Sequence, residues 1–363
     1  MDRLTNKPTN KGAHASLSRA RVFPHNTAWY RKRLQKLLET LDSRTRMTES
    51  TLSKVLFNRI LRASGGDLTA TAIITGNDSR LARVKLFYAC PLVSRLQTLY
   101  VQVADSANQE LWRAIRKDPP KSIHIDIVNN DIYIGSRLCP TRDAIRQAIG
   151  RLQGELLCCG RPSTVLELQH YHNLFTLYTL WMFFYTTGVR GVRTPYVDLS
   201  EIDPVFRLGI LTDKDSGVGY KTRLVRFTSM LIEQMRFYKD FISRSPLSYR
   251  LPESPCFLLQ SNLNPVEVRP RTLASLLKEF LPFPVNIHRR FVSSELLDAG
   301  CPPEMVSAWM GHWHRGEEPW GKFSSFSYGD YCRALEDFLD PLLDDLGFRA
   351  IKGGASTKPR GMR

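Results

Sequence analysis

The chain has 363 residues, 42% of them hydrophobic, so it is long and apolar enough to bury a large core and to form two domains. Lys and Arg number 51 against 35 Asp and Glu, a formal net charge of +16. This excess favours a polyanionic partner, either nucleic acid or an anionic membrane surface. The longest apolar run, residues 174–185, is shorter than the roughly 20 residues that cross a bilayer, which excludes a membrane span and indicates a buried helix.

The seven cysteines form an odd set without a C-x-x-C pair. No charged and then apolar signal segment opens the chain. We therefore expect free thiols and a reducing compartment, the cytoplasm.

The first 36 residues contain nine Lys or Arg and one acid, with little periodicity. Such a segment is either a flexible arm that contacts DNA phosphates or a solvated leader, and both interpretations stay open.

Residues 37–159 are predicted to form an N-terminal DNA-binding region. Apolar residues recur every three or four positions between 34 and 63, which indicates two amphipathic helices ended by Gly65-Gly66. Further helices are predicted over 81–103 and 108–115. Alternating isoleucines between 123 and 134 predict a β-hairpin. Thr141 is expected to cap a helix that reaches about Leu157.

A boundary at Gly160-Arg161-Pro162 introduces a predicted catalytic domain, residues 160–346, followed by a basic tail, residues 347–363. Its predicted elements are helices over 172–185, 227–242, 292–299, 302–311 and 335–346, and two strands over 205–211 and 220–227. Gly188, Gly300 and Gly311 are expected to end three of these helices. The fold class is therefore mostly α with a small antiparallel β-sheet.

Five motifs of this second half stand in a particular order. They are Thr187-Gly188-Val189-Arg190, Lys214 beside a hairpin turn, Asn286 to Arg289, Met310-Gly311-His312, and Tyr328 or Tyr331. This order resembles the catalytic domain of the tyrosine recombinase (phage integrase) family over residues 160–345, about half of the chain. Each motif alone is weak, and the ordered set is more specific.

The spacing from Arg289 to Gly300 and on to His312 follows the run that leads from the second arginine to the histidine in the resembled family. This register selects Arg289, and not Arg290, as the phosphate ligand. Three positions depart from the family pattern. Asn286 replaces its histidine, Arg193 replaces an acid, and the interval from His312 to either tyrosine is long.

The resemblance implies a division of roles. Arg190 and Arg289 would clamp a phosphodiester, because guanidinium groups match its geometry with two parallel hydrogen bonds. The arginine pair would also make a phenol reactive: Tyr331 is the preferred nucleophile and Tyr328 the alternative. Lys214 would protonate the departing 5′ oxygen, and His312 would hydrogen-bond the phosphate or assist proton transfer.

Arg193, Lys221 and Arg290 are expected to contact the DNA backbone or to be exposed charges. No metal and no cofactor is expected, because the phosphotyrosyl ester conserves the bond for rejoining.

The leading hypothesis is a site-specific recombinase or integrase of a mobile element, a two-domain clamp that cuts and rejoins double-stranded DNA through a 3′-phosphotyrosyl intermediate. The resemblance implies a homo-oligomer, a tetramer on DNA, in which the last helix docks on a neighbouring protomer; packing of that helix on its own domain is the alternative. Two other functions remain: a catalytically inactive DNA-binding protein with a recombinase fold, and a type IB topoisomerase-like enzyme.

Overall fold

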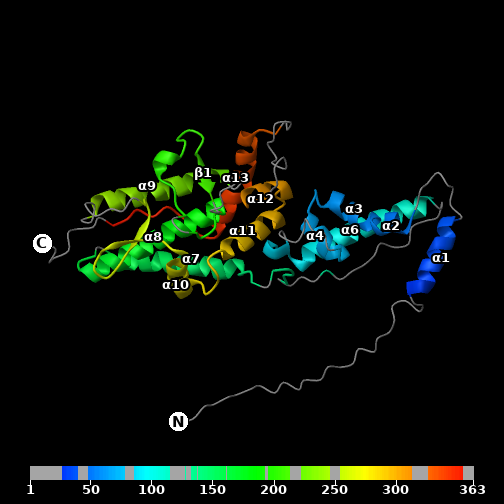
Figure 1. The fold of residues 1–363 in the computed structure, drawn as a ribbon, viewed down its shortest axis with the longest axis horizontal. Helices are drawn as coiled ribbons and strands as arrows, with labels where there is room; N and C mark the ends of the chain where they lie inside the picture. The colour runs from blue at the N-terminus through cyan, green and yellow to red at the C-terminus, as the bar shows by residue number, and fades with distance from the viewer. Residues whose placement is uncertain are drawn as a thin grey trace, which may run out of the picture. The chain divides into compact units, whose positions relative to one another are not determined.

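A computed structural model of the chain describes residues 27–39, 48–77, 86–114, 127, 132–136, 138–160, 162–192, 195–212, 222–245, 254–312 and 326–354. The chain divides into two compact units, Met1–Leu56 and Phe57–Arg363. The first contains α1 (Thr27–Glu39) and α2 (Glu49–Ser53), where Thr48 caps α2 by accepting a hydrogen bond from the Thr51 backbone N–H. The described residues are mostly helical, as predicted, and no helix among them is long and apolar enough to cross a membrane (Figure 1).

Three helices follow: α3 (Val55–Ala63), α4 (Leu68–Thr75) and α6 (Val93–Ala114). Gly65 and Gly66 both have positive φ and end α3, as expected. The helix α6 runs unbroken through a stretch where the sequence predicted a break between residues 103 and 108. No Gly or Pro occurs there, so polar residues that interrupt the apolar pattern do not interrupt the helix.

The predicted hairpin over residues 123–134 lies mostly outside the described residues. Its second strand is described, and it pairs with the residues before α6. Leu92 and Tyr133 form an antiparallel bridge, and the Val93 N–H donates to the Ile132 carbonyl at 2.9 Å. This pairing joins residues 91–93 to residues 132–134.

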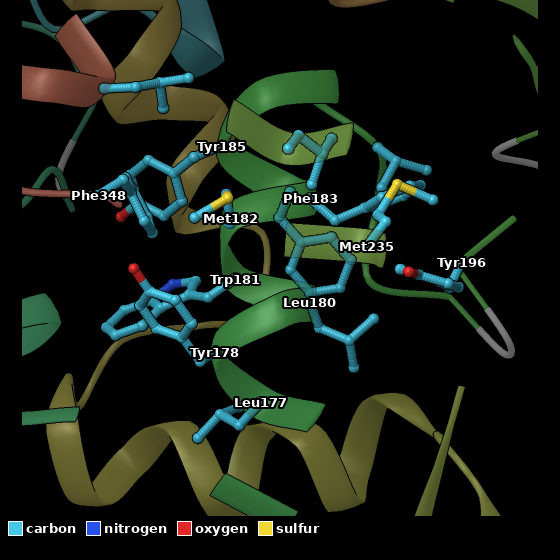
Figure 2. Close-up of a cluster of buried hydrophobic side chains, with 14 of the residues drawn as sticks. Leu177, Tyr178, Leu180, Trp181, Met182, Phe183, Tyr185, Tyr196, Met235 and Phe348 are labelled. Carbon is cyan, nitrogen blue, oxygen red and sulfur yellow. The ribbon is translucent and has the colours of Figure 1, made fainter. Parts of the chain in front are cut away.

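The helix α8 (Val165–Thr187) forms the centre of the core, and every residue from Leu174 to Thr187 is buried. Figure 2 shows Tyr178 and Tyr185 against Phe348 on one side of α8, and Phe183 beside Tyr196 on the other. The neighbouring α7 (Arg142–Cys158) and α9 (Ser229–Arg244) pack on α8. Such all-round burial explains why the run is apolar throughout.

Thr141 caps α7, as predicted from the sequence. The buried residues of α7 belong to the same hydrophobic cluster as those of α8, so the core is continuous across the expected boundary at residue 160. The boundaries expected at residues 36, 160 and 346 remain predictions.

Two small antiparallel sheets are present among the described residues. The strands β1 (Leu208–Thr212) and β2 (Thr222–Arg226) form the predicted hairpin. A second pair, β3 (Phe257–Leu259) with β4 (Pro265–Glu267), and the following α10 (Pro270–Phe280) were not predicted. Strands of three residues are too short to show an alternation in the sequence. A 3₁₀ turn, η2 (Leu199–Glu201), precedes β1.

Three helices complete the domain: α11 (Ile287–Asp298), α12 (Pro303–Trp309) and α13 (Tyr328–Asp345). The helix α11 begins five residues before the predicted start at Val292. Ser327 and Asp330 form a capping box at the start of α13. The apolar face of α13 is buried in the common core beside α8 and α11, which is the packing on its own domain that the sequence left as an alternative.

Candidate functional site

The end of α8 turns sharply at Gly188. Its φ is +62°, in the left-handed region, and its N–H donates to the Phe184 carbonyl. A Cβ atom at this position would lie 2.8 Å from the Trp309 ring. Glycine is therefore needed both for the backbone conformation and for the close approach of α12.

Four successive carbonyl groups at this turn each meet a side chain from another element. The Thr186 carbonyl accepts from Trp309 Nε1 at 2.9 Å, and the Thr187 carbonyl accepts from Arg223 Nη1 at 2.8 Å. The Gly188 carbonyl accepts from Arg289, and the Val189 carbonyl lies 2.8 Å from His288 Nε2. The last carbonyls of a helix lack intrahelical partners and carry the negative end of its dipole, so cationic donors are favourable there.

The same two arginines also reach the end of α12. Arg223 donates to the Trp309 carbonyl, and Arg289 Nη2 donates to the Met310 carbonyl at 2.6 Å. Two guanidinium groups therefore join the ends of α8 and α12 at adjacent positions. Gly311, with φ +64°, leaves room for this arrangement, because a Cβ there would lie 3.1 Å from Arg223 Cδ.

Arg289 connects the predicted motifs. Its side chain is 0% exposed, and Nη2 lies 3.2 Å from His312 Nε2. Asn286, three residues earlier, accepts a hydrogen bond from the Gly191 backbone N–H at 2.9 Å, next to Arg190. The structure thus brings together the turn that carries Arg190, the start of α11 and the turn that carries His312.

His288 is a structural residue. Its ring stacks on Phe184 with centroids 5.2 Å apart, and its two nitrogens lie 3.1 and 2.8 Å from the carbonyl oxygens of Val285 and Val189. Burial, followed by the charge of Arg289, lowers the pKa of His288 to about 3. A neutral imidazole has one N–H and donates to only one of these two carbonyls. Buried in this way, His288 does not replace the proton-transfer function that the resembled family assigns to the position of Asn286.

The two candidate nucleophiles lie in the first turn of α13, with ring centroids 5.5 Å apart. Tyr331 is 3% exposed, whereas Tyr328 is partly exposed. Burial raises the pKa of both phenols, and the positive charge of Arg223 acts in the opposite direction on both. In this structure burial outweighs the effect of Arg223 on both phenols.

Arg223 is the residue that the sequence analysis missed. It lies on β2, where Arg223 and Val225 are buried while Leu224 between them is exposed. An arginine in phase with the buried positions of a strand is a usable signal, because a buried charge requires partners. The signal was hidden by the basic residues on both sides.

The remaining predicted residues differ in their placement. Lys214, Arg193 and Lys221 lie outside the described residues. Arg290 is described: its guanidinium lies 4.3 Å from the centre of the Phe87 ring, and Nη1 donates to the Leu138 carbonyl at 3.3 Å. Arg290 is therefore held in part by residues of the N-terminal half.

No protein-family model and no curated protein matches the chain. Among solved structures, XerA recombinase is similar at 13% identity and a TM-score of 0.33, covering 89% of this chain and 100% of its own. The Tn1549 transposon integrase, solved with circular intermediate DNA, is similar at 14% identity and a TM-score of 0.33, covering 88% of this chain and 95% of its own. Both are tyrosine recombinases, the family that the motifs resemble. Likeness at this TM-score does not by itself assign the chain a function.

Proposed function

We propose that the chain is a tyrosine-type DNA recombinase that cuts and rejoins duplex DNA. One observation carries the proposal: three segments far apart in sequence, residues 188–191, 286–290 and 310–312, meet around the buried guanidinium of Arg289. A net charge of +16 suits the same partner.

The proposed step is an in-line transfer of a phosphoryl group. The phenol oxygen of a tyrosine gives up its proton to water and bonds to phosphorus. The bond from phosphorus to the 5′ oxygen breaks, and the leaving oxygen takes a proton from Lys214. The DNA 3′ end is then held as a phosphotyrosyl ester. Arg190, Arg289 and His312 would stabilise the negative charge that grows on the non-bridging oxygens. Reversal of these transfers rejoins the strand.

Burial does not decide between the two tyrosines, so Tyr331 stays the preferred nucleophile and Tyr328 the alternative. Tyr331 is 3% exposed. Tyr328 is partly exposed as a residue, but its phenol oxygen is buried, so either phenol must move to meet a phosphate. Arg223 acts on both phenols and therefore does not discriminate between them.

A second candidate, a DNA-binding protein without activity, is favoured by a separate observation. Arg289 is fully buried on backbone carbonyls, and burial raises the pKa of both phenols. This arrangement also suits a site that only holds the fold together. The two candidates differ in one measurable property, the covalent bond to DNA.

The test uses fluorescent nicked duplexes of randomised sequence, whose short cleaved fragment diffuses away and traps the adduct. We expect a band that resists denaturant and contains DNA. Tyr331→Phe should abolish it, while Tyr328→Phe should retain it. If Tyr328→Phe alone abolishes the adduct, the alternative nucleophile is correct. If wild type binds DNA and forms no adduct, the inactive DNA-binding protein is correct.

The same trapped adducts distinguish a site-specific recombinase from a topoisomerase-like enzyme. Sequencing the trapped duplexes should show one enriched site for a site-specific enzyme. Relaxation of supercoiled plasmid without an enriched site would instead indicate the topoisomerase-like function.

A further inference from the structure

The N-terminal half contributes an aromatic ring to the candidate site. The ring centroid of Tyr88 lies 4.9 Å from that of His312, with planes at 47°. The guanidinium carbon of Arg289 lies 5.5 Å from the centre of the same ring. One side chain therefore contacts both the cation and the imidazole on which the proposed chemistry depends.

The segment that carries Tyr88 is fixed to α11. The Cys90 backbone N–H donates to Ser294 Oγ at 2.9 Å. The Ser136 N–H donates to the Ala89 carbonyl at 2.9 Å, and a Cβ on Gly135 would lie 2.6 Å from that oxygen. The backbone that follows Tyr88 is thus hydrogen-bonded to α11 and to residues 135–136.

A second connection lies one turn further along. Arg95 bridges to Asp298 at the end of α11 at 3.2 Å and to the buried Asp67 at 3.1 Å. These contacts hold the Tyr88 ring beside Arg289 and His312. Moving the ring away requires breaking the hydrogen bonds and ion pairs that join its segment and α6 to α11.

We propose that Tyr88 is a positioning residue, which holds the Arg289 guanidinium and the His312 imidazole in the geometry that a phosphate requires; this rests on the proposed function. An aromatic face attracts a guanidinium, and a tilted ring pair restricts an imidazole. The contact is made by the ring, so the hydroxyl group is dispensable.

The activity test compares three variants with wild type. Tyr88→Leu should slow adduct formation at saturating nicked duplex by about tenfold, as expected for losing contacts of this strength. Tyr88→Phe should stay within about twofold of wild type. Phe206→Leu, the same kind of change at an exposed aromatic residue before β1, should also stay within about twofold. DNA affinity, measured by anisotropy, should change little in all three.

A readout that needs no catalysis separates this inference from the proposed function. With ¹³C-labelled histidine, the ring protons of His312, assigned through His312→Gln, should carry a ring-current shift in wild type and Tyr88→Phe that disappears in Tyr88→Leu. If wild type forms no adduct, the proposed function fails, while the shift still tests the placement of the ring. The positioning function is overturned if the shift is absent, if Tyr88→Leu reacts at the wild-type rate, or if Tyr88→Phe is as slow as Tyr88→Leu.

Discussion

Arg223 and Arg289 place two positive charges in the interior, 4% and 0% exposed. Charged side chains are seldom buried without compensation. The compensation comes from carbonyls at two helix ends, which are otherwise unsatisfied and carry the negative end of the helix dipoles. These two cations therefore have a structural function at the ends of α8 and α12, whatever they do in the proposed reaction.

A substitution measures the structural part of this arrangement. Arg223→Met keeps much of the side-chain volume but leaves the carbonyls of Thr187 and Trp309 without their donor. We expect the free energy of unfolding, measured in urea, to fall by about 3 kcal/mol, since each buried unsatisfied group costs about 1–3 kcal/mol. Arg236→Met, on the exposed face of α9, is the control and should change little. Equal stability of both variants would contradict the stabilisation that we attribute to the two hydrogen bonds of Arg223.

Two buried histidines predict a loss of stability in acid. Burial lowers the pKa of His288 to about 3 and that of His172 to about 4, below the ordinary value of 6.5. The unfolded chain binds these protons first, so stability is full above about pH 6.5 and falls as the pH drops toward the folded values. Each pH unit in this window should remove up to about 1.4 kcal/mol for each histidine.

The measurement is urea unfolding at pH 7.5, 5.5 and 4.5. His288→Gln stays neutral throughout and keeps an N–H donor for the Val189 carbonyl. Its stability should therefore fall less steeply than that of wild type over the same range. A parallel fall in both proteins would show that protonation of His288 does not contribute.

At the scale of elements, the site depends on the close approach of α8 and α12. Gly188→Ala adds a Cβ 2.8 Å from the Trp309 ring at a φ of +62°. We expect the free energy of unfolding to fall by more than the roughly 1 kcal/mol that a left-handed non-glycine residue costs, because the Trp309 ring must also move. Gly160→Ala is the matched control, since its φ is +55° and nothing lies within 4 Å.

The free energy of unfolding of Gly160→Ala should fall only by the cost of placing alanine in the left-handed backbone conformation. The difference between the two variants then reports the contact with Trp309. If Gly188→Ala is no worse than Gly160→Ala, α12 does not press on the end of α8 in solution.

Element ends were the part of the fold that local sequence predicted best. Thr141 caps α7, and Gly188 and Gly300 follow α8 and α11 with positive φ. These signals are local, because a cap needs only its own residue and the next three or four. The unpredicted β3 and β4 lack such signals, because the strands have three residues each. The helix α10 has no side-chain cap, and its one local signal, Pro270 at the first position, was not used.

For the whole molecule, the net charge of +16 predicts binding that depends strongly on salt. Counterions released from DNA make the logarithm of the affinity fall linearly with the logarithm of salt concentration. We expect affinity for a labelled duplex of random sequence to drop by roughly 100-fold or more between 50 and 200 mM NaCl, measured by fluorescence anisotropy. Affinity that is constant over this range would contradict a phosphate-dominated interface, whatever the adduct assay shows.

The sequence by itself determined the helical class, the glycines that end α8 and α11, and the order of the motifs, because composition, periodicity and caps act over a few residues. It also selected Arg289 over Arg290, and the structure buries the first and leaves the second beside Phe87. Only the tertiary structure decided that Arg223 and Tyr88 belong to the site. Each reaches Arg289 or its neighbouring carbonyls across many residues of chain, and such contacts depend on packing between elements, which no local pattern records.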